Sequence, residues 1–369
     1  MIEYTVLTLN PGSTSMKIGL FRNEANLFMS NLDIPADVIK TFATLYDQYL
    51  YRKKLVIAEV EKHGFKMNEI SVFLARVGGM VPCDGGVYGV NDKLMDFNNI
   101  KEKNNLSPQQ MGCQFVRDFS KEFCGEGYVI NDSAVDEFLD VAHVTGLKGV
   151  WRGTYSHTLN QKAVGELAAT AFGGKYETAR LIIAHLGGGI SIGAHCNGRM
   201  IDSTNLVGEG PMSPTRTGAL AVGDVLRQLM EQKSDIKGLF KKSLVNGGGL
   251  IDHLGTADGR EVEKRIANGD RYAKLIYDGM IYQIGQSVAS KAASLEGHVD
   301  GIVLTGGMAN SHYIQEGVGK YCRWIAPIYV YAGEYETEAM VNAALKVMRG
   351  EETIKEYTGE PTFDSSKYQ

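Results

Sequence analysis

Two glycine-bearing segments carry residue types that suit close approach of the backbone to a ligand. Asn10-Pro-Gly-Ser-Thr-Ser15 and His185-Leu-Gly-Gly-Gly189 each lie between two short apolar stretches. Clustered glycine is typical of turns where the chain adopts positive φ or lies close to a ligand. Each segment therefore predicts a β-hairpin whose tip presents backbone amides and small polar side chains.

A different chemistry is suggested by Gly189-Ile-Ser191-Ile-Gly193, which fits the GxSxG pattern around the nucleophile of serine hydrolases. That nucleophile needs a strand, a sharp turn and then a helix. Here alternating apolar residues and the hairpin signal Asn197-Gly198 follow, which predicts a strand instead. A hydrolase using Ser191 is an alternative that labelling by diisopropyl fluorophosphate would support. GxxxxGK[ST] and GxGxxG motifs are absent, which argues against Walker-type and Rossmann-type nucleotide sites.

The bulk properties place the chain among ordinary globular proteins with two domains. It has 369 residues, a net charge of −5 and 44 glycines, and its five cysteines form no CxxC pair. The charge and the lack of a basic cluster argue against a nucleic-acid partner. No apolar run reaches 18 residues and no signal peptide opens the sequence, so no membrane segment and a cytoplasmic location are expected.

Helices and strands are expected to alternate, which favours an α/β fold. Ser107-Pro108-Gln-Gln110 is a capping-box pattern with proline at the first helical position. The predicted helices are 37–63, 107–123, 132–144 (capped by Asp132), 157–172, 269–296 and 336–348, and two further strands are 301–305 and 327–331. The two hairpins lie 175 residues apart, which suggests a duplicated module with one copy in each domain.

The two hairpins, together with the stretch Gly301–Ser311, resemble the phosphate and adenosine motifs of the actin-like ATPase superfamily. Within it, the chain resembles the butyrate kinase branch of the acetokinase family over nearly its whole length. The matching segments keep the family's order: 9–15, 82–91, 159–163, 185–191, 197–202, 208–214 and 333–339. The resemblance implies an α/β, two-domain fold of the acetate and sugar kinase type, with duplicated ribonuclease-H-like domains and an inter-domain cleft. Residues 1–145 plus 339–369 would form the N-terminal domain and 146–338 the C-terminal domain.

The activity implied by the resemblance is reversible transfer of the ATP γ-phosphoryl group to butyrate, with Mg²⁺ as cofactor and ADP and an acyl phosphate as products. A carboxylate is already an anionic nucleophile at pH 7, so the reaction needs cations and amides rather than a general base. Isobutyrate, propionate or acetate as substrate stays open. So does a non-catalytic nucleotide binder, because Ser107 and Val77 depart from the usual family residues. A homo-oligomer is also implied.

The resemblance assigns roles to individual residues. Arg76, His185, Arg216 and Asp132 would be catalytic, with Asn131 as the alternative to Asp132. The nucleotide-binding residues would be Asn10, Ser13, Ser15, Lys17, Gly187, Gly188, Gly189, Asp202, Gly306 and Gly307. The metal-binding residues would be Asn10 and Glu334, with Glu336 and Glu338 as rivals; all three acids also suit the first turn of a helix. Structural alternatives are salt bridges for the arginines, a core position for His185 and helix caps for Asp132 and Ser107.

Overall fold

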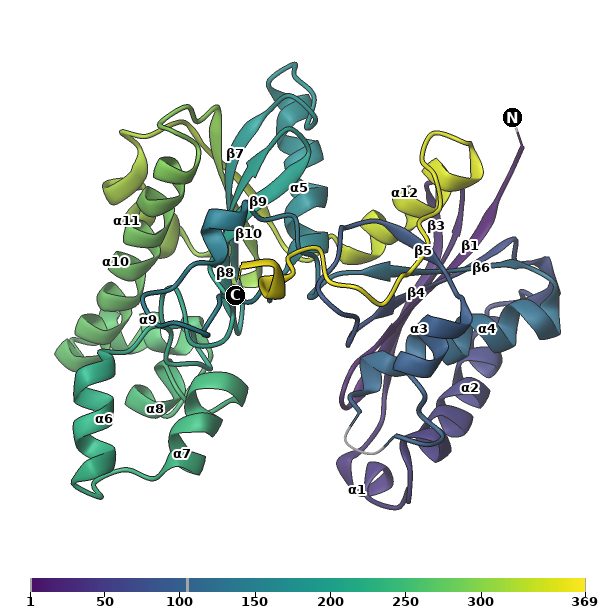
Figure 1. The fold of residues 1–369 in the computed structure, drawn as a ribbon, viewed down its shortest axis with the longest axis horizontal. Helices are drawn as coiled ribbons and strands as arrows, with labels where there is room; N and C mark the ends of the chain where they lie inside the picture. The colour runs from purple at the N-terminus through teal and green to yellow at the C-terminus, as the bar shows by residue number, and fades with distance from the viewer. Residues whose placement is uncertain (1, 104–105, 369) are drawn as a thin grey trace. The chain divides into compact units, whose positions relative to one another are not determined.

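The computed structural model describes residues 2–103 and 106–368, which form two compact units. The first unit runs up to Asp136 and resumes at Tyr335, and the second comprises Glu137–Glu334. Each unit contains one mixed β-sheet and its own helices (Figure 1). The units change at 136/137 and 334/335, whereas the predicted domains change at 145/146 and 338/339. The domain assignment stays a prediction.

The sheet of the first unit has the strand order β3-β2-β1-β4-β6-β5. Strands β1, β4 and β6 are parallel to one another, so their carboxyl ends share one edge of the sheet. Side chains of Phe73, Phe115 and Phe119 pack in the core beneath it. The elements are β1 (Thr5–Pro11), β2 (Ser15–Arg22), β3 (Ala25–Asp33), α1 (Ala36–Ile39), α2 (Leu45–Lys62), β4 (Val72–Val77), β5 (Val87–Gly89), α3 (Asp92–Phe97), α4 (Met111–Phe123), β6 (Glu126–Asn131) and α12 (Glu336–Met348).

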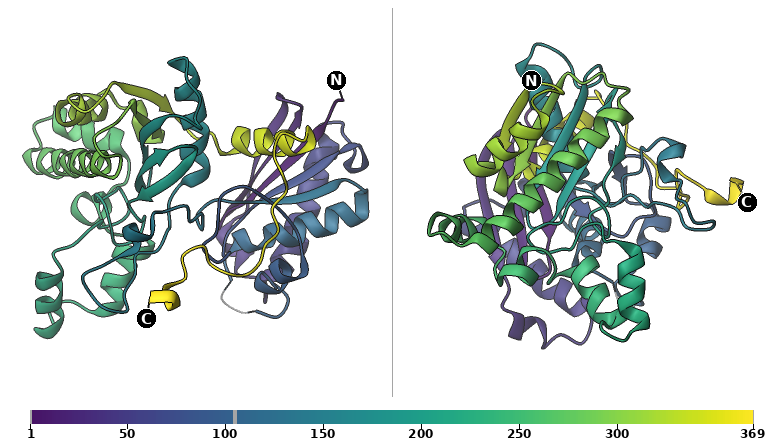
Figure 2. Two further views of the ribbon diagram at one scale, coloured as in Figure 1. Left: turned by 45° about the horizontal axis from the view of Figure 1, so that its top comes forward. Right: turned by 90° about the vertical axis from the view of Figure 1, so that its left-hand side faces the viewer.

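Helix α12 belongs to the first unit although it lies near the end of the chain. It contacts β1 and β4, and its yellow ribbon lies against the strands of the first unit (Figure 2). It buries Met340, Val341, Ala344 and Leu345. This packing fixes the first turn of α12 near the carboxyl ends of the parallel strands.

The second unit has the strand order β11-β10-β7-β8-β9, with β7, β10 and β11 parallel. Apolar side chains of α10 and α11 pack in the core with the inner strands. The elements are α5 (Thr158–Ala171), β7 (Arg180–Leu186), β8 (Ile190–Cys196), β9 (Arg199–Ser203), α6 (Val222–Met230), α7 (Ile236–Phe240), α8 (Leu250–Leu254), α9 (Gly259–Ala267), α10 (Arg271–Ser294), β10 (Gly301–Gly306), α11 (His312–Cys322) and β11 (Ile328–Ala332).

Most predicted elements are confirmed, including both hairpins, the capping box at Ser107, and helices α5, α10 and α12. Two predictions are wrong. The helix 37–63 is two helices, because Thr44 forms a capping box with Asp47 that starts α2 anew. The helix 132–144 does not form; β6 ends at Asn131, and the next helical element is the short 3₁₀ turn Asp140–His143. Within 2–103 and 106–368, no helix has the length and hydropathy needed to cross a membrane.

Candidate functional site

The carboxyl ends of the parallel strands in the first unit gather a group of charged and polar side chains. Arg76 of β4 forms ion pairs with Asp132, which directly follows β6, and with Glu336 of α12, where Nη1 lies 3.2 Å from Oε2. The same Glu336 oxygen accepts a hydrogen bond from Asn10 Nδ2 at 3.2 Å. Asp132 is only 1% exposed. Four predicted or rival site residues therefore share one cluster.

This cluster bears on two alternatives that the sequence leaves open. Asp132 pairs with Arg76, whereas the Asn131 amide donates to Cys83 Sγ at 3.3 Å. Asp132 caps no helix, so the prediction of a cap is wrong. The carboxylate of Glu336, a rival of the predicted Glu334, accepts a hydrogen bond from Asn10. Asp132 and Glu336 thus both pair with Arg76, and the choice among the rival residues stays a prediction.

The first hairpin tip is held from behind by Arg52, which the sequence analysis does not single out. Its guanidinium donates to the carbonyls of Gly12 (2.9 Å), Ser13 (3.0 Å) and Ser15 (2.9 Å). The side chain is 1% exposed, and burial lowers its pKa, although a guanidinium remains charged. A buried cation thus lies directly under the tip. Its signal in the sequence is a charged residue on the apolar stripe of α2 that is otherwise Tyr49, Val56 and Val60.

Other predicted residues of the first unit lie on or near this tip. Ser13 is exposed at the turn, and Lys17 of β2 is the cross-strand neighbour of Asn10. A Cβ added to Gly78, just after β4, would lie 3.9 Å from Ser107 Oγ. Ser107 therefore lies near the Arg76 end of β4 while it caps the following helix.

In the second unit, His185 lies near the end of β7 and is 5% exposed. Its Nδ1 lies 3.0 Å from Asn160 Oδ1, which also accepts from Thr305 Oγ1 at 3.2 Å. The ring stacks on that of His157, the N-cap residue of α5, with centroids 3.8 Å apart. Both imidazoles are thus fixed by contacts from α5, β7 and β10.

Arg216 is brought to the glycine tip of the second hairpin. Thr215 fastens its loop there, because its backbone N–H and its Oγ1 both donate to the Gly188 carbonyl, at 3.2 and 2.8 Å. A Cβ on Gly189 would lie 2.2 Å from Arg216 Nη1. Arg216 Nε is buried without a hydrogen-bond partner in the described parts of the chain. An anionic ligand bound at this tip could accept the hydrogen bond that the Arg216 guanidinium has to offer.

Gly306 lies against the same hairpin. Its φ is +83°, and a Cβ would come within 2.4 Å of the Leu186 carbonyl oxygen. It exchanges two 3.1 Å backbone hydrogen bonds with Gly333, whereas the Cα of Gly307 faces open space. Glycine is therefore required at 306, and the turn leaves room beside 307.

Asp202 is a buried ion-pair centre. Its Oδ1 accepts from Arg152 at 3.1 Å, and Oδ2 accepts from Lys291 at 2.5 Å and Ser294 at 2.8 Å. Burial alone raises the Asp202 pKa, but Lys291 and Arg152 outweigh it and hold that pKa below its usual range. Both oxygens are thus used within the unit, which favours a structural role over the predicted contact with nucleotide.

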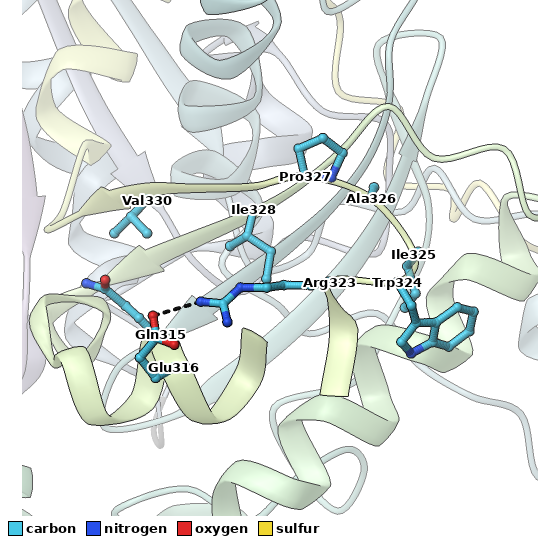
Figure 3. A pocket seen from close by; sticks show the side chains of 9 residues that line it. All are labelled: Gln315, Glu316, Arg323, Trp324, Ile325, Ala326, Pro327, Ile328 and Val330. Carbon is cyan, nitrogen blue, oxygen red and sulfur yellow. Dashed lines mark hydrogen bonds and ion pairs between the residues drawn. The ribbon is translucent and has the colours of Figure 1, made fainter. Parts of the chain in front are cut away.

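Two other features do not form a site. Ser191 lies within strand β8 and is fully buried, so the turn-to-helix geometry of a hydrolase nucleophile is missing. A surface pocket of about 480 Å³ lies between α11 and β11, lined by Trp324, Val330 and the ion pair Arg323–Glu316 among others (Figure 3). Its described lining includes none of the predicted site residues.

Within the described ranges, no group of three or more His, Cys, Asp and Glu side chains is arranged to hold a metal ion.

Comparisons with known proteins agree with this architecture. The model of the Acetokinase family matches residues 144–325. The chain is 34% identical to Butyrate kinase 1 of Clostridium acetobutylicum and 37% identical to the Probable butyrate kinase of Coprothermobacter proteolyticus, each over 96% of this chain and 99% of the relative. It superposes on the crystal structure of Porphyromonas gingivalis acetate kinase with a TM-score of 0.74 at 20% identity, covering 94% of this chain and 100% of that one.

Proposed function

The chain belongs to the acetokinase family and has its two-domain actin-like fold, and from this premise we propose that it is an ATP-dependent butyrate kinase. The butyrate names of two relatives that match over nearly their whole length support the substrate. The observation that carries the proposal is an arginine near each hairpin: Arg76 shares the Glu336 carboxylate with Asn10 in one unit, and Arg216 lies against Gly189 in the other. Isobutyrate, propionate and acetate remain alternative substrates.

The proposed reaction needs charge stabilisation more than proton transfer. A carboxylate oxygen of butyrate bonds to the γ-phosphorus, the bond from that phosphorus to the β–γ bridging oxygen breaks, and ADP leaves with the electron pair. Arg216 and the amides of Gly188 and Gly189 would stabilise phosphate oxygens in the second unit, where His185 would lie beside the transferring group. Arg76, oriented by Asp132, would bind oxyanions in the first.

Asn10 and Glu336 fit a role beside Mg²⁺. Amide and carboxylate oxygens are the ligands this ion prefers, and it usually takes only one or two from the protein when bound with a nucleotide. When bound, it would neutralise charge on the transferring phosphates. Ser13, Ser15 and Lys17 would contact phosphate at the first tip, and Gly306 and Gly307 would border the adenosine.

A hydroxamate assay tests this function. The protein is incubated with ATP, Mg²⁺, hydroxylamine and acetate, propionate, butyrate, isobutyrate or valerate in turn, and any acyl phosphate is trapped as a coloured iron complex. Two extra buried methylenes are worth ~1.6 kcal/mol, or about fifteen-fold for butyrate over acetate. A peak at butyrate supports the proposal, and a peak at another acid replaces the substrate. No signal from folded protein that binds nucleotide contradicts a kinase.

We also propose a cytoplasmic homo-oligomer whose copies meet at α6. Along one face of this helix, Val222, Leu226 and Met230 are 68%, 54% and 84% exposed. Such a stripe of apolar side chains is typical of a protein–protein contact. Leu226→Glu should lower the mass measured by light scattering, whereas the neighbouring Arg227→Glu should not. An unchanged mass in the first variant contradicts a contact through α6.

A further inference from the structure

Five side chains of the second unit form one continuous hydrogen-bond chain that ends at His157. Tyr176 Oη lies 2.7 Å from His195 Nδ1, and His195 Nε2 lies 2.9 Å from Gln161 Oε1. Gln161 Nε2 lies 2.8 Å from Ser191 Oγ, which lies 2.9 Å from His157 Nδ1. All links except His157 are less than 9% exposed.

Proton positions along this chain follow from what each atom can do. The carbonyl oxygen Gln161 Oε1 only accepts, so His195 carries its proton on Nε2 and accepts from Tyr176 at Nδ1. Ser191 Oγ accepts from Gln161 Nε2 and, at 3.3 Å, from the His157 backbone N–H. Its single hydrogen then goes to His157 Nδ1. His157 is therefore left with its own proton on Nε2.

Burial keeps His195 and Tyr176 uncharged in spite of the charged groups around them. Burial, with a smaller contribution from Lys162, lowers the pKa of His195 to about 3, and burial raises the pKa of Tyr176 well above its ordinary value. Lys162 is itself paired with Glu137. Other groups that face the chain are Glu166 and Glu177 near Tyr176, and His185 stacked on His157. His195 and Tyr176 thus stay neutral across the pH range in which the protein would work.

Gly193 keeps space for the chain. A Cβ there would lie 2.4 Å from Gln161 Oε1 and 2.8 Å from His195 Nε2. The Ser191-Ile-Gly193 part of the hydrolase-like pattern therefore has a different explanation. The serine joins Gln161 to His157, and the glycine leaves space beside Gln161 and His195.

We propose that Ser191 is a positioning residue of the kinase reaction, which acts by holding His157 in the tautomer protonated on Nε2. This rests on the proposed function. Asn160 Oδ1 fixes the opposite tautomer on His185, with the proton on Nδ1. In these tautomers His157 Nε2–H can donate to an anionic phosphoryl oxygen, whereas His185 Nε2 can only accept. Losing the Ser191 hydroxyl would let His157 switch tautomer and withdraw that donor.

The test combines a spectroscopic and a kinetic readout. ¹⁵N NMR of histidine-labelled wild-type protein reports which ring nitrogen is protonated, and the His157→Gln spectrum identifies the His157 signals among the eight histidines. Ser191→Ala should give a mixture of His157 tautomers. It should lower kcat roughly tenfold to a hundredfold, the usual cost of losing an orienting partner, with the KM values for ATP and butyrate nearly unchanged. Ser203→Ala, a buried serine of neighbouring β9 outside the chain, is the matched control.

The outcomes separate the two proposals. A wild-type His157 protonated on Nδ1 overturns the positioning role without any variant. So does a Ser191→Ala protein with unchanged kcat, or one with no greater loss than Ser203→Ala. Absence of acyl phosphate from the wild type overturns the proposed function instead, while the tautomer measurement still decides whether Ser191 orients His157.

Discussion

The two hairpin tips both carry glycine but are held by different sets of interactions. The first tip lies over the buried Arg52 guanidinium, which binds three of its carbonyls. The second has Arg216 beside Gly189 and is bordered by the stacked His157 and His185 and the chain that orients them. A buried cation adds positive potential under a tip, whereas a neutral chain fixes direction and tautomer. The difference suggests that the first tip mainly attracts phosphate and the second mainly aligns the transferring group.

The arginines beside the tips should show the largest effects. Arg76 is held between Asp132 and Glu336, whereas Arg216 Nε has no hydrogen-bond partner in the described ranges. Arg216→Ala should lower kcat about 10³-fold, as loss of a phosphoryl-binding arginine does. Arg227→Ala, an exposed arginine of the same unit, is the kinetic control. A loss below tenfold would contradict a role for Arg216 at the phosphoryl group.

Arg52→Met should destabilise the folded protein at the first tip. It leaves three carbonyls without their donor and should lower the free energy of unfolding by about 3 kcal/mol. The KM for ATP should rise as well, because the positive potential is lost. Urea unfolding and steady-state kinetics measure the two effects, and Lys53→Met, one residue further on α2, is the control. An unchanged KM in folded Arg52→Met would remove the attractive role and leave a purely structural one.

Local sequence patterns predicted the strands and helices around both tips but not the tertiary contacts that stabilise the tips. The hairpins, α5 and α12 follow from apolar periodicity and glycine placement, and all are present. The helix that Asp132 was expected to cap does not form, because aspartate is as common in turns as at helix N-caps. Only the tertiary ion pair with Arg76 reveals where Asp132 lies. Arg52 and Ser13 are 39 residues apart, and Gln161 and Ser191 are 30 apart. Contacts over such separations leave no local periodicity, so the sequence could not show them.

The buried, uncharged His195 in the chain behind the second tip predicts a pH dependence of the free energy of unfolding. The pKa of His195 is about 3 in the folded protein and about 6.5 when unfolded. Between these values the unfolded state binds the extra proton, so stability falls as pH drops below about 6.5, by about 2–3 kcal/mol at pH 4.5. His195→Gln, which keeps a donor toward Gln161, should flatten this part of the urea-unfolding profile. The exposed His253→Gln should not, and equal slopes for all three proteins would show that His195 is not the group responsible.

The smallest effect should distinguish two adjacent glycines of the second tip. A Cβ on Gly189 would lie 2.2 Å from Arg216 Nη1, whereas one on Gly188 would meet only Thr215 Cγ2 at 3.7 Å. Because the Arg216 end is flexible, Gly189→Ala should displace it without unfolding the protein and lower kcat roughly tenfold. Gly188→Ala removes the same backbone freedom and should leave kcat within about twofold. Equal losses in the two variants would mean that the tip depends on glycine flexibility, and a loss confined to Gly189→Ala would mean that it depends on where the guanidinium lies.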